Sequence, residues 1–390
     1  MASPSPSTLP PLPLPKGTTS SYADCRASCG LNVHYLSSGT PGNPLILFCH
    51  GFPELAYSWR RVLPAIAKLG YYCVAPDQRG YGRTTGPNDG QSWEQVDLGE
   101  YVLTNLVRDM VCFVYKLGYK QVECVVGHDF GAVSSAMCAL MRPDIFKSTI
   151  QMSHPHHAPP SPPFGLESQA KEAVDIQAEL AKLQPPRKHY KWYNSSASAA
   201  RDWENPEQGL EEYLRGYFHL KSADWKANNP RPLREWSAEA VAEMPEYYIM
   251  RKEHTFPQSI AANMMGEDAT ATERWLSQQD LQVFVQEWSR TGFQGALNWY
   301  RAQTASTPQS KKDLLLFAGR RIEVPCAFIS GEQDWGNYQQ PGAFESYEDP
   351  KIVAERCFRG ATMVEGAGHW VQQEKSQEVV EAIARFLNTL

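Results

Sequence analysis

One stretch of eight residues, 125–132, constrains the fold of this chain more than any other. It reads Val-Val-Gly-His-Asp-Phe-Gly-Ala, with an apolar segment typical of a buried strand before it and an Ala-rich segment typical of a helix after it. Gly127 and Gly131 bracket Asp129 at the spacing that a nucleophile elbow requires. A side chain at either glycine is expected to clash where strand and helix approach each other. The spacing therefore predicts a strained turn that presents Asp129.

The aspartate at the centre of this turn determines the chemistry that the turn can perform. Nucleophile elbows commonly carry Ser, whereas the carboxylate of Asp129 is ionised at neutral pH and needs no base to activate it. A carboxylate nucleophile suits displacement at a saturated carbon, which gives an alkyl ester. An ordinary Gly-bracketed strand end shows the same local pattern, so this interpretation depends on partner residues elsewhere in the chain.

Length and composition exclude several classes of protein. The 390 residues suffice for one large α/β domain with an insertion, or for two domains. A formal net charge of −6 without Lys/Arg runs argues against nucleic acid as a partner, and the apolar runs are too short to span a membrane. Residues 1–16 are rich in Pro and Ser and lack the apolar segment of a signal peptide. Four of the nine cysteines lie in apolar strand-like runs, so we expect reduced thiols and a cytoplasmic location.

Strand-like segments alternate with helical patterns on both sides of the elbow. This alternation predicts an α/β fold with a mostly parallel sheet and helices on both faces. The strands are expected at 44–50, 71–77, 122–125, 148–152, 324–330 and 361–365, after an opening hairpin at 25–35.

The alternation stops at Pro155. From there to about Lys312 the sequence shows helical patterns at 167–183, 209–219, 237–250 and 280–290, without strand runs. We interpret this stretch as a helical cap inserted after the sixth core strand. The predicted organisation is a disordered or strap-like leader at 1–20, core at 21–157, cap at 158–312 and core again at 313–390.

Two polar residues stand directly after predicted strands, at the edge where open α/β sheets bind ligands. Asp334 follows one late strand and His369 follows the last. With Asp129 they give the chain order nucleophile, acid, histidine that is expected of a catalytic triad on such a sheet. Each residue alone has an ordinary interpretation as a loop or turn residue, but their joint occurrence predicts a hydrolytic site.

A third loop could supply an oxyanion hole. His50-Gly51-Phe52-Pro53 follows the first central strand, and the N–H groups of Phe52 and Phe130 are candidate donors to a developing oxyanion. A tight turn closed by Gly and Pro is the structural alternative for this motif.

Four motifs together resemble the epoxide hydrolases, soluble type, of the α/β-hydrolase superfamily. They are His50-Gly51-Phe52-Pro53-Glu54, Asp77-Gln78-Arg79-Gly80-Tyr81-Gly82, Gly127-His128-Asp129-Phe130-Gly131 and Gly368-His369-Trp370. The similarity extends from about residue 29 onward and is weakest from roughly 224 to 279. It implies the α/β-hydrolase fold, an epoxide and water as reactants, and no metal or organic cofactor. The many tryptophans of the predicted cap indicate that the epoxide, a small molecule, is bulky and apolar.

The resemblance also implies two cap tyrosines that activate the epoxide. The segment 292–301 resembles the family motif that carries one of them, which implies Tyr300. His189-Tyr190-Lys191-Trp192-Tyr193 resembles the context of the other and implies Tyr190, with Tyr193, Tyr213 and Tyr217 as nearby alternatives. Expected substrate contacts are Phe52, Trp299 and Trp370.

The implied reaction has two steps. Asp129 attacks an epoxide carbon while the two tyrosines stabilise the ring oxygen, which gives a hydroxyalkyl ester. His369, oriented by Asp334, then activates a water that hydrolyses the ester and releases a vicinal diol. A haloalkane dehalogenase is the nearest alternative, but those enzymes typically place Trp where this chain has Phe130. A non-catalytic binding protein on the same fold is a further alternative.

A histidine cluster at 154, 156 and 157 could suggest a metal site. No carboxylate or Cys is adjacent to it, so we interpret the segment as the beginning of the cap and expect no metal.

Overall fold

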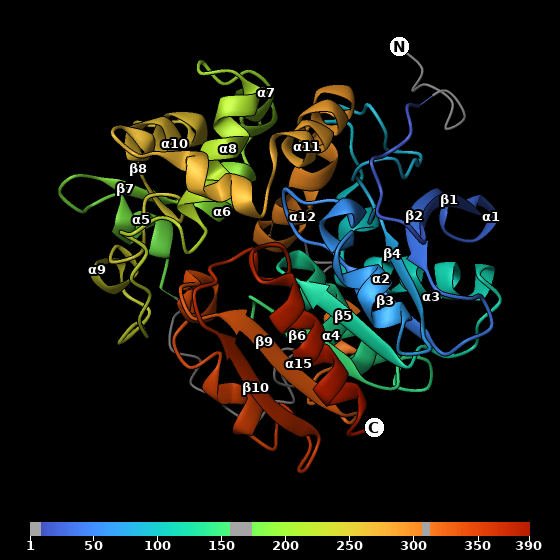
Figure 1. Ribbon diagram of the computed structural model, residues 1–390. Coiled ribbons are helices and arrows are strands. Elements are labelled where there is room, and N and C mark those ends of the chain that lie inside the picture. The colour runs from blue at the N-terminus through green and yellow to red at the C-terminus, as the bar shows by residue number, and fades with distance from the viewer. Residues whose placement is uncertain (1–8, 157–173, 306–312) are drawn as a thin grey trace.

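An eight-stranded sheet forms the centre of the computed structural model, which describes residues 9–156, 174–305 and 313–390 (Figure 1). The strand order is β1-β2-β4-β3-β5-β6-β9-β10, in which the pairs β1–β2 and β2–β4 are antiparallel and the others parallel. The predicted mostly parallel sheet is therefore confirmed. The strands are β1 (Thr18–Cys25), β2 (Leu31–Ser38), β3 (Leu45–Cys49), β4 (Tyr72–Pro76), β5 (Cys124–His128), β6 (Thr149–Met152), β9 (Cys326–Gly331) and β10 (Phe358–Val364).

Helices cover both faces of this sheet because its central strands are apolar on both sides. Every residue of β3, β4 and β5 is buried, as expected for parallel strands between two helical layers. Helices α2 (Val62–Ala67) and α15 (Ser376–Leu387) pack on one face, and α3 (Leu103–Lys116) and α4 (Phe130–Met141) pack on the other. Each layer forms its own hydrophobic cluster with the strands.

The N-terminal segment differs from the sequence interpretation in two details. Strand β1 begins at Thr18, inside the stretch predicted as leader, and the short helix α1 (Arg26–Cys29) lies where a simple hairpin turn was expected. Gly30 ends that helix with a positive φ of 80°, so it does supply the left-handed residue of the turn. Residues 9–17 run over the surface as a strap, where Tyr57 donates a hydrogen bond to the Pro13 carbonyl at 3.1 Å.

The chain between β6 and β9 is mainly helical, which confirms an insertion after the sixth core strand. Figure 1 shows α7, α8, α10 and α11 grouped on one side of the sheet. The described helices of this region are α5 (Ile176–Leu180), α6 (Tyr190–Asn194), α7 (Ala199–Glu204), α8 (Leu210–Leu220), α9 (Ala238–Val241), α10 (Phe256–Met264), α11 (Gln278–Thr291) and α12 (Gln294–Thr304).

The prediction that this insertion contains no strand is wrong. Strands β7 (Arg187–His189) and β8 (Ile249–Arg251) pair antiparallel. Strand β8 occupies the end of the stretch predicted as a helix at 237–250. Three residues are too few to show the alternating pattern of a strand. The predicted helix at 167–183 lies partly outside the described residues.

Indole groups hold the insertion against the sheet. The ring N–H groups of Trp288 and Trp299 donate to the carbonyls of Pro53 and Arg79, each at 2.9 Å. Both carbonyls belong to loops that follow core strands, so the insertion covers the carboxyl edge of the sheet. Among the described helices, none is both long and apolar enough to cross a membrane.

We expect Gly131→Ala to destabilise the protein, because a Cβ at this position would lie 2.1 Å from the Cys49 carbonyl oxygen. Backbone atoms surround the site, so the elbow would have to move, at a cost of about 1–3 kcal/mol. Urea unfolding would measure the loss against Val133→Ala, a partly buried position on the same helix. Wild-type stability in Gly131→Ala would contradict the close approach.

Candidate active site

Asp129 lies at the sharp turn between β5 and α4, with φ of 52° and ψ of −115°. A side chain rarely adopts this conformation, and the surrounding glycines permit it. A Cβ on Gly127 would lie 1.9 Å from the Gly131 carbonyl oxygen, so the predicted clash at the elbow is confirmed. The turn directs the carboxylate toward the loop after β3, where the Phe52 N–H donates to Asp129 Oδ1 at 3.0 Å.

The structure places the three residues of the predicted triad together. His369 Nε2 lies 3.5 Å from Asp129 Oδ2, and His369 Nδ1 lies 3.1 Å from each Asp334 oxygen. Because a carboxylate only accepts, Nδ1 carries a hydrogen that points to Asp334, and Nε2 is the ring nitrogen on the side of Asp129. The backbone N–H of Gly336 donates to Asp334 Oδ1 at 2.6 Å and fixes that carboxylate.

Both carboxylates are ionised although they are buried. Burial alone would raise the pKa of Asp129, but the hydrogen bond and charge of His369, with the charges of Lys221 and His128, hold it well below its usual range. Burial would also raise the pKa of Asp334, but the charge and the hydrogen bond of His369 lower it. The elbow therefore presents Asp129 as a carboxylate anion.

A buried ion pair supports the histidine loop, and sequence reasoning did not identify it. The ring of His128 faces two acceptors, Glu54 Oε2 at 2.5 Å from Nδ1 and the His369 carbonyl oxygen at 2.7 Å from Nε2. Both ring nitrogens therefore carry hydrogens, which makes His128 an imidazolium. Glu54 raises the pKa of His128 against the effect of burial, and His128 lowers that of Glu54. Both residues stand in the quoted motifs, but nothing in those motifs shows that they pair.

A buried lysine is a second residue that the sequence did not reveal. Lys221 is 3% exposed, and its ammonium lies 5.1 Å from the ring centroids of Tyr248 and Trp370. No described residue accepts a hydrogen bond from this ammonium. Its backbone carbonyl accepts the His369 N–H at 2.8 Å. A lysine at the end of an amphipathic helix usually faces solvent, so the sequence pattern gave no signal.

Two tyrosines of the insertion stand opposite the carboxylate. The rings of Tyr190 and Tyr300 are 5.7 Å apart, and Tyr300 packs 5.4 Å from the ring of Phe52. Burial raises the pKa of both phenols well above its usual value, and the charge of Asp129 acts in the same direction. Both are therefore protonated hydrogen-bond donors.

Tyr193, one of the three tyrosines named as alternatives to Tyr190, faces away from Asp129. Its hydroxyl donates to Asp202 at 2.6 Å, and its pKa responds to burial and Asp202 rather than to Asp129. The hydroxyl of Tyr190 donates to Gln339 at 3.2 Å, on the core side of the site. The geometry supports Tyr190 over Tyr193.

The other predicted contacts line the site as aromatic walls. Phe130 begins α4, so its N–H has no partner within the helix, and its ring lies 4.6 Å from that of Tyr300. Trp299 and Trp370 are buried, and their ring N–H groups donate to the Arg79 and Phe218 carbonyls, each at 2.9 Å. These indoles can therefore offer a ligand their ring surfaces only. Their role as substrate contacts stays a prediction.

The histidine cluster is only partly described. Burial lowers the pKa of His154 and of His156 to about 4, so both rings are neutral. His157 lies outside the described residues. Among the residues that the structure describes, no group of His, Cys, Asp and Glu could hold a metal ion.

The sheet order and the strand–turn–helix elbow are those of the α/β-hydrolase fold. A family model described as the alpha/beta hydrolase fold matches residues 44–227, and the predicted fold class is confirmed.

Within this class the chain is similar to epoxide hydrolases, as its motifs predicted. It is 28% identical to epoxide hydrolase A of Mycobacterium tuberculosis over 93% of this chain and 95% of the relative. It is 29% identical to an epoxide hydrolase of Caballeronia sordidicola over 93% of each. A solved epoxide hydrolase from an endophytic Streptomyces aligns with a TM-score of 0.74 at 27% identity, over 96% of each chain. Potato epoxide hydrolase I aligns at 0.69 and 27%, over 96% of this chain and 100% of its own.

We expect Glu54→Gln to destabilise the protein by about 3 kcal/mol, because it leaves the buried imidazolium of His128 without a counter-charge. The pair's contribution is complete only above the unfolded pKa of Glu, about 4.3, and below that of His, about 6.5. It falls as pH drops through the lowered pKa of Glu54 or rises through the raised pKa of His128.

Denaturant unfolding should therefore give a larger loss for Glu54→Gln at pH 5.5 than at pH 8.5. The exposed Glu355→Gln is the control and should change neither value. An equal loss at both pH values would show that the pair keeps one charge state over this pH range.

Proposed function

We propose that the protein hydrolyses an epoxide to a vicinal diol through a covalent ester on Asp129. One observation carries the proposal: the elbow holds an ionised carboxylate, with His369 Nε2 at 3.5 Å on one side and two buried phenols opposite. The curated relatives and the solved structures to which this chain is similar are epoxide hydrolases, which also supports the proposal.

In the first step the two oxygens of Asp129 have different roles. Oδ1 accepts the Phe52 N–H at 3.0 Å, and Oδ2 faces His369. We assign Oδ2 to attack an epoxide carbon and Oδ1 to become the ester carbonyl. As the carbon–oxygen bond of the ring breaks, Tyr190 and Tyr300 donate to the leaving oxygen, which is protonated to a hydroxyl.

In the second step His369 acts as a general base. Its Nδ1–H remains bound to Asp334, so Nε2 can take a proton from a water that attacks the ester carbon. The oxyanion then forms on Oδ1, where the Phe52 N–H already donates and the Phe130 N–H lies at the helix start. The bond between the ester carbon and Oδ2 then breaks, His369 gives its proton to the departing oxygen, and the diol leaves with Oδ2 while the water oxygen stays on Asp129. The new acid group of Asp129 loses its proton, which replaces the one that the tyrosine gave up.

A haloalkane dehalogenase would need N–H donors for the halide. Phe130 has none on its ring, and the indoles of Trp299 and Trp370 already donate to backbone carbonyls. An opened epoxide instead leaves an alkoxide, which is a much stronger base than a halide and needs a proton donor. The phenols of Tyr190 and Tyr300 can supply that proton. Turnover of styrene oxide but not of 1-chlorobutane would support the epoxide proposal, and turnover of neither would support a binding protein.

We further propose that residues 158–312 act as a cap over the nucleophile, and that the protein works in the reducing cytoplasm. All nine cysteines are free thiols, which supports the second point.

His369→Gln should form the ester and fail to hydrolyse it, because attack by Asp129 does not need the base. Intact-protein mass spectrometry after mixing with styrene oxide should show a gain of one epoxide mass, on the peptide containing residue 129. Asp129→Ala is the matched control and should gain nothing. Lost turnover in His369→Gln without an adduct would mean that His369 acts before the ester forms.

Tyr190→Phe and Tyr300→Phe should each slow ester formation by about ten- to a thousandfold, because each removes one donor to the leaving oxygen. The double variant should be nearly inactive while folded, since no proton donor remains. Single-turnover alkylation would measure each rate, with circular dichroism as the folding test and Tyr193→Phe as the control. If the double variant is alkylated at the wild-type rate, the two tyrosines only pack in the insertion and do not activate the epoxide.

A further inference from the structure

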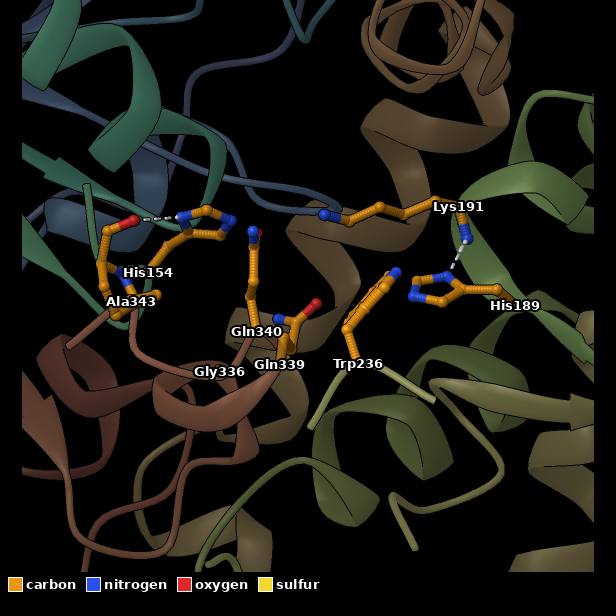
Figure 2. Close-up of a pocket in the computed structure, with 9 residues that line it drawn as sticks. His154, His189, Lys191, Trp236, Gly336, Gln339, Gln340 and Ala343 are labelled. Atoms are coloured by element: carbon orange, nitrogen blue, oxygen red, sulfur yellow. Dashed lines mark hydrogen bonds between the residues drawn. The ribbon is translucent and has the colours of Figure 1, made fainter. Parts of the chain in front are cut away.

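A hollow lies beside the proposed catalytic groups, at the seam between the insertion and the loop after β9 (Figure 2). It contains about 330 Å³ of empty space, part of which is open to solvent. We call it the Lys191 pocket. Its polar lining consists of His154, His189, Lys191, Trp236, Gln339 and Gln340.

The walls of this pocket touch the catalytic groups directly. Gln339 accepts the hydroxyl hydrogen bond of Tyr190 at 3.2 Å. Gly336, another wall residue, donates its N–H to the triad carboxylate of Asp334. Through these two contacts the pocket adjoins the groups that are proposed to hold the substrate.

The pocket offers a positive charge that no carboxylate of the described residues neutralises. Figure 2 shows the Lys191 side chain extended across it, with the ammonium on the side of His154 and Gln340. Among the described residues no acid forms an ion pair with Lys191, and none of the pocket's lining residues is acidic. Burial lowers the pKa of this ammonium, and the charge of Asp129 opposes that shift. An ammonium that is partly desolvated and unpaired costs stability, which favours a ligand as its partner.

The neutral groups of the pocket also present donors. His189 Nδ1 accepts the Lys191 backbone N–H at 3.2 Å, and burial holds the pKa of His189 well below its usual value. Its ring is therefore neutral with the hydrogen on Nε2, a donor. The carbonyl of Gln339 is used by Tyr190, so its amide N–H groups are available.

We propose that the Lys191 pocket binds a carboxylate of the substrate, so that the preferred substrates are epoxides that carry an acidic group. The inference rests on the proposed function and adds the substrate class. Tyr190 has a single hydroxyl hydrogen, so it turns from Gln339 when it donates to an epoxide oxygen. With hydrogen bonds of about 2.8 Å, an epoxide oxygen on Tyr190 and a carboxylate on the Gln339 amide would lie roughly 11 Å apart or less. The carboxylate therefore lies near the oxirane ring.

A matched pair of styrene oxides tests this inference: 4-(oxiran-2-yl)benzoate and the corresponding benzamide, equal in shape and different in charge. The wild-type protein should prefer the acid at least tenfold in kcat/KM. Lys191→Met should reduce the acid-to-amide ratio at least tenfold, and Lys191→Arg should retain most of it. Because the acid-to-amide ratio compares two substrates in the same variant, a loss of activity that affects both substrates cancels.

Lys188→Met is the matched control, since Lys188 lies three residues away over the ring of Tyr193 at 4.8 Å and does not line the pocket. It should leave the ratio unchanged. An unchanged ratio in Lys191→Met, or equal use of acid and amide by the wild type, would overturn the inference.

Product inhibition gives a second readout that needs no variant. The diol acid should inhibit styrene oxide turnover by the wild type at least tenfold more strongly than the diol amide, and equal inhibition would overturn the inference. If styrene oxide, the acid and the benzamide are all left unchanged by the wild type, the proposed function fails instead. If they are hydrolysed without any preference for the acid, only the present inference fails.

Discussion

The structure depends on keeping one buried carboxylate ionised at a strained turn. Asp129 has a backbone φ of 52° and a largely buried side chain. Two conditions make this tolerable: glycines where strand and helix cross, and donors and positive charges around the carboxylate. Side chains in place of the glycines would clash at the turn, and without the charges burial would favour the protonated acid.

The same requirement couples the helical insertion to the core. The backbone of Lys221 accepts the N–H of His369, and its side chain supplies charge to the nucleophile. The carboxylate of Glu374 accepts N–H groups from Ala223 in the insertion and from Gly368 in the histidine loop, each at 2.9 Å. The insertion therefore helps to position the loop that carries His369, the proposed base.

Much of the core and its order of catalytic residues could be predicted from the sequence. Continuous apolar runs such as 45–49 and 72–76 can only be strands buried on both faces. Asp334 and His369 follow strands at the edge where such sheets gather their polar groups, and they do meet Asp129 there. The short elements escaped prediction, because helix α1 and strands β7 and β8 are too brief to establish a period.

The sequence by itself determined the chemistry that is available: a carboxylate between two glycines, an acid and a histidine in order, and tyrosines in an insertion. Only the tertiary structure decided which of these groups act and in what charge state. Tyr190 rather than Tyr193 faces the site because helix α6 turns one hydroxyl to Gln339 and the other to Asp202. The sequence also did not reveal that His128 is an imidazolium. Nor did it reveal that the ammonium groups of Lys191 and Lys221 lack an acidic partner among the described residues. A side chain's charge state depends on its burial and on partners brought from distant parts of the chain, and folding alone creates both.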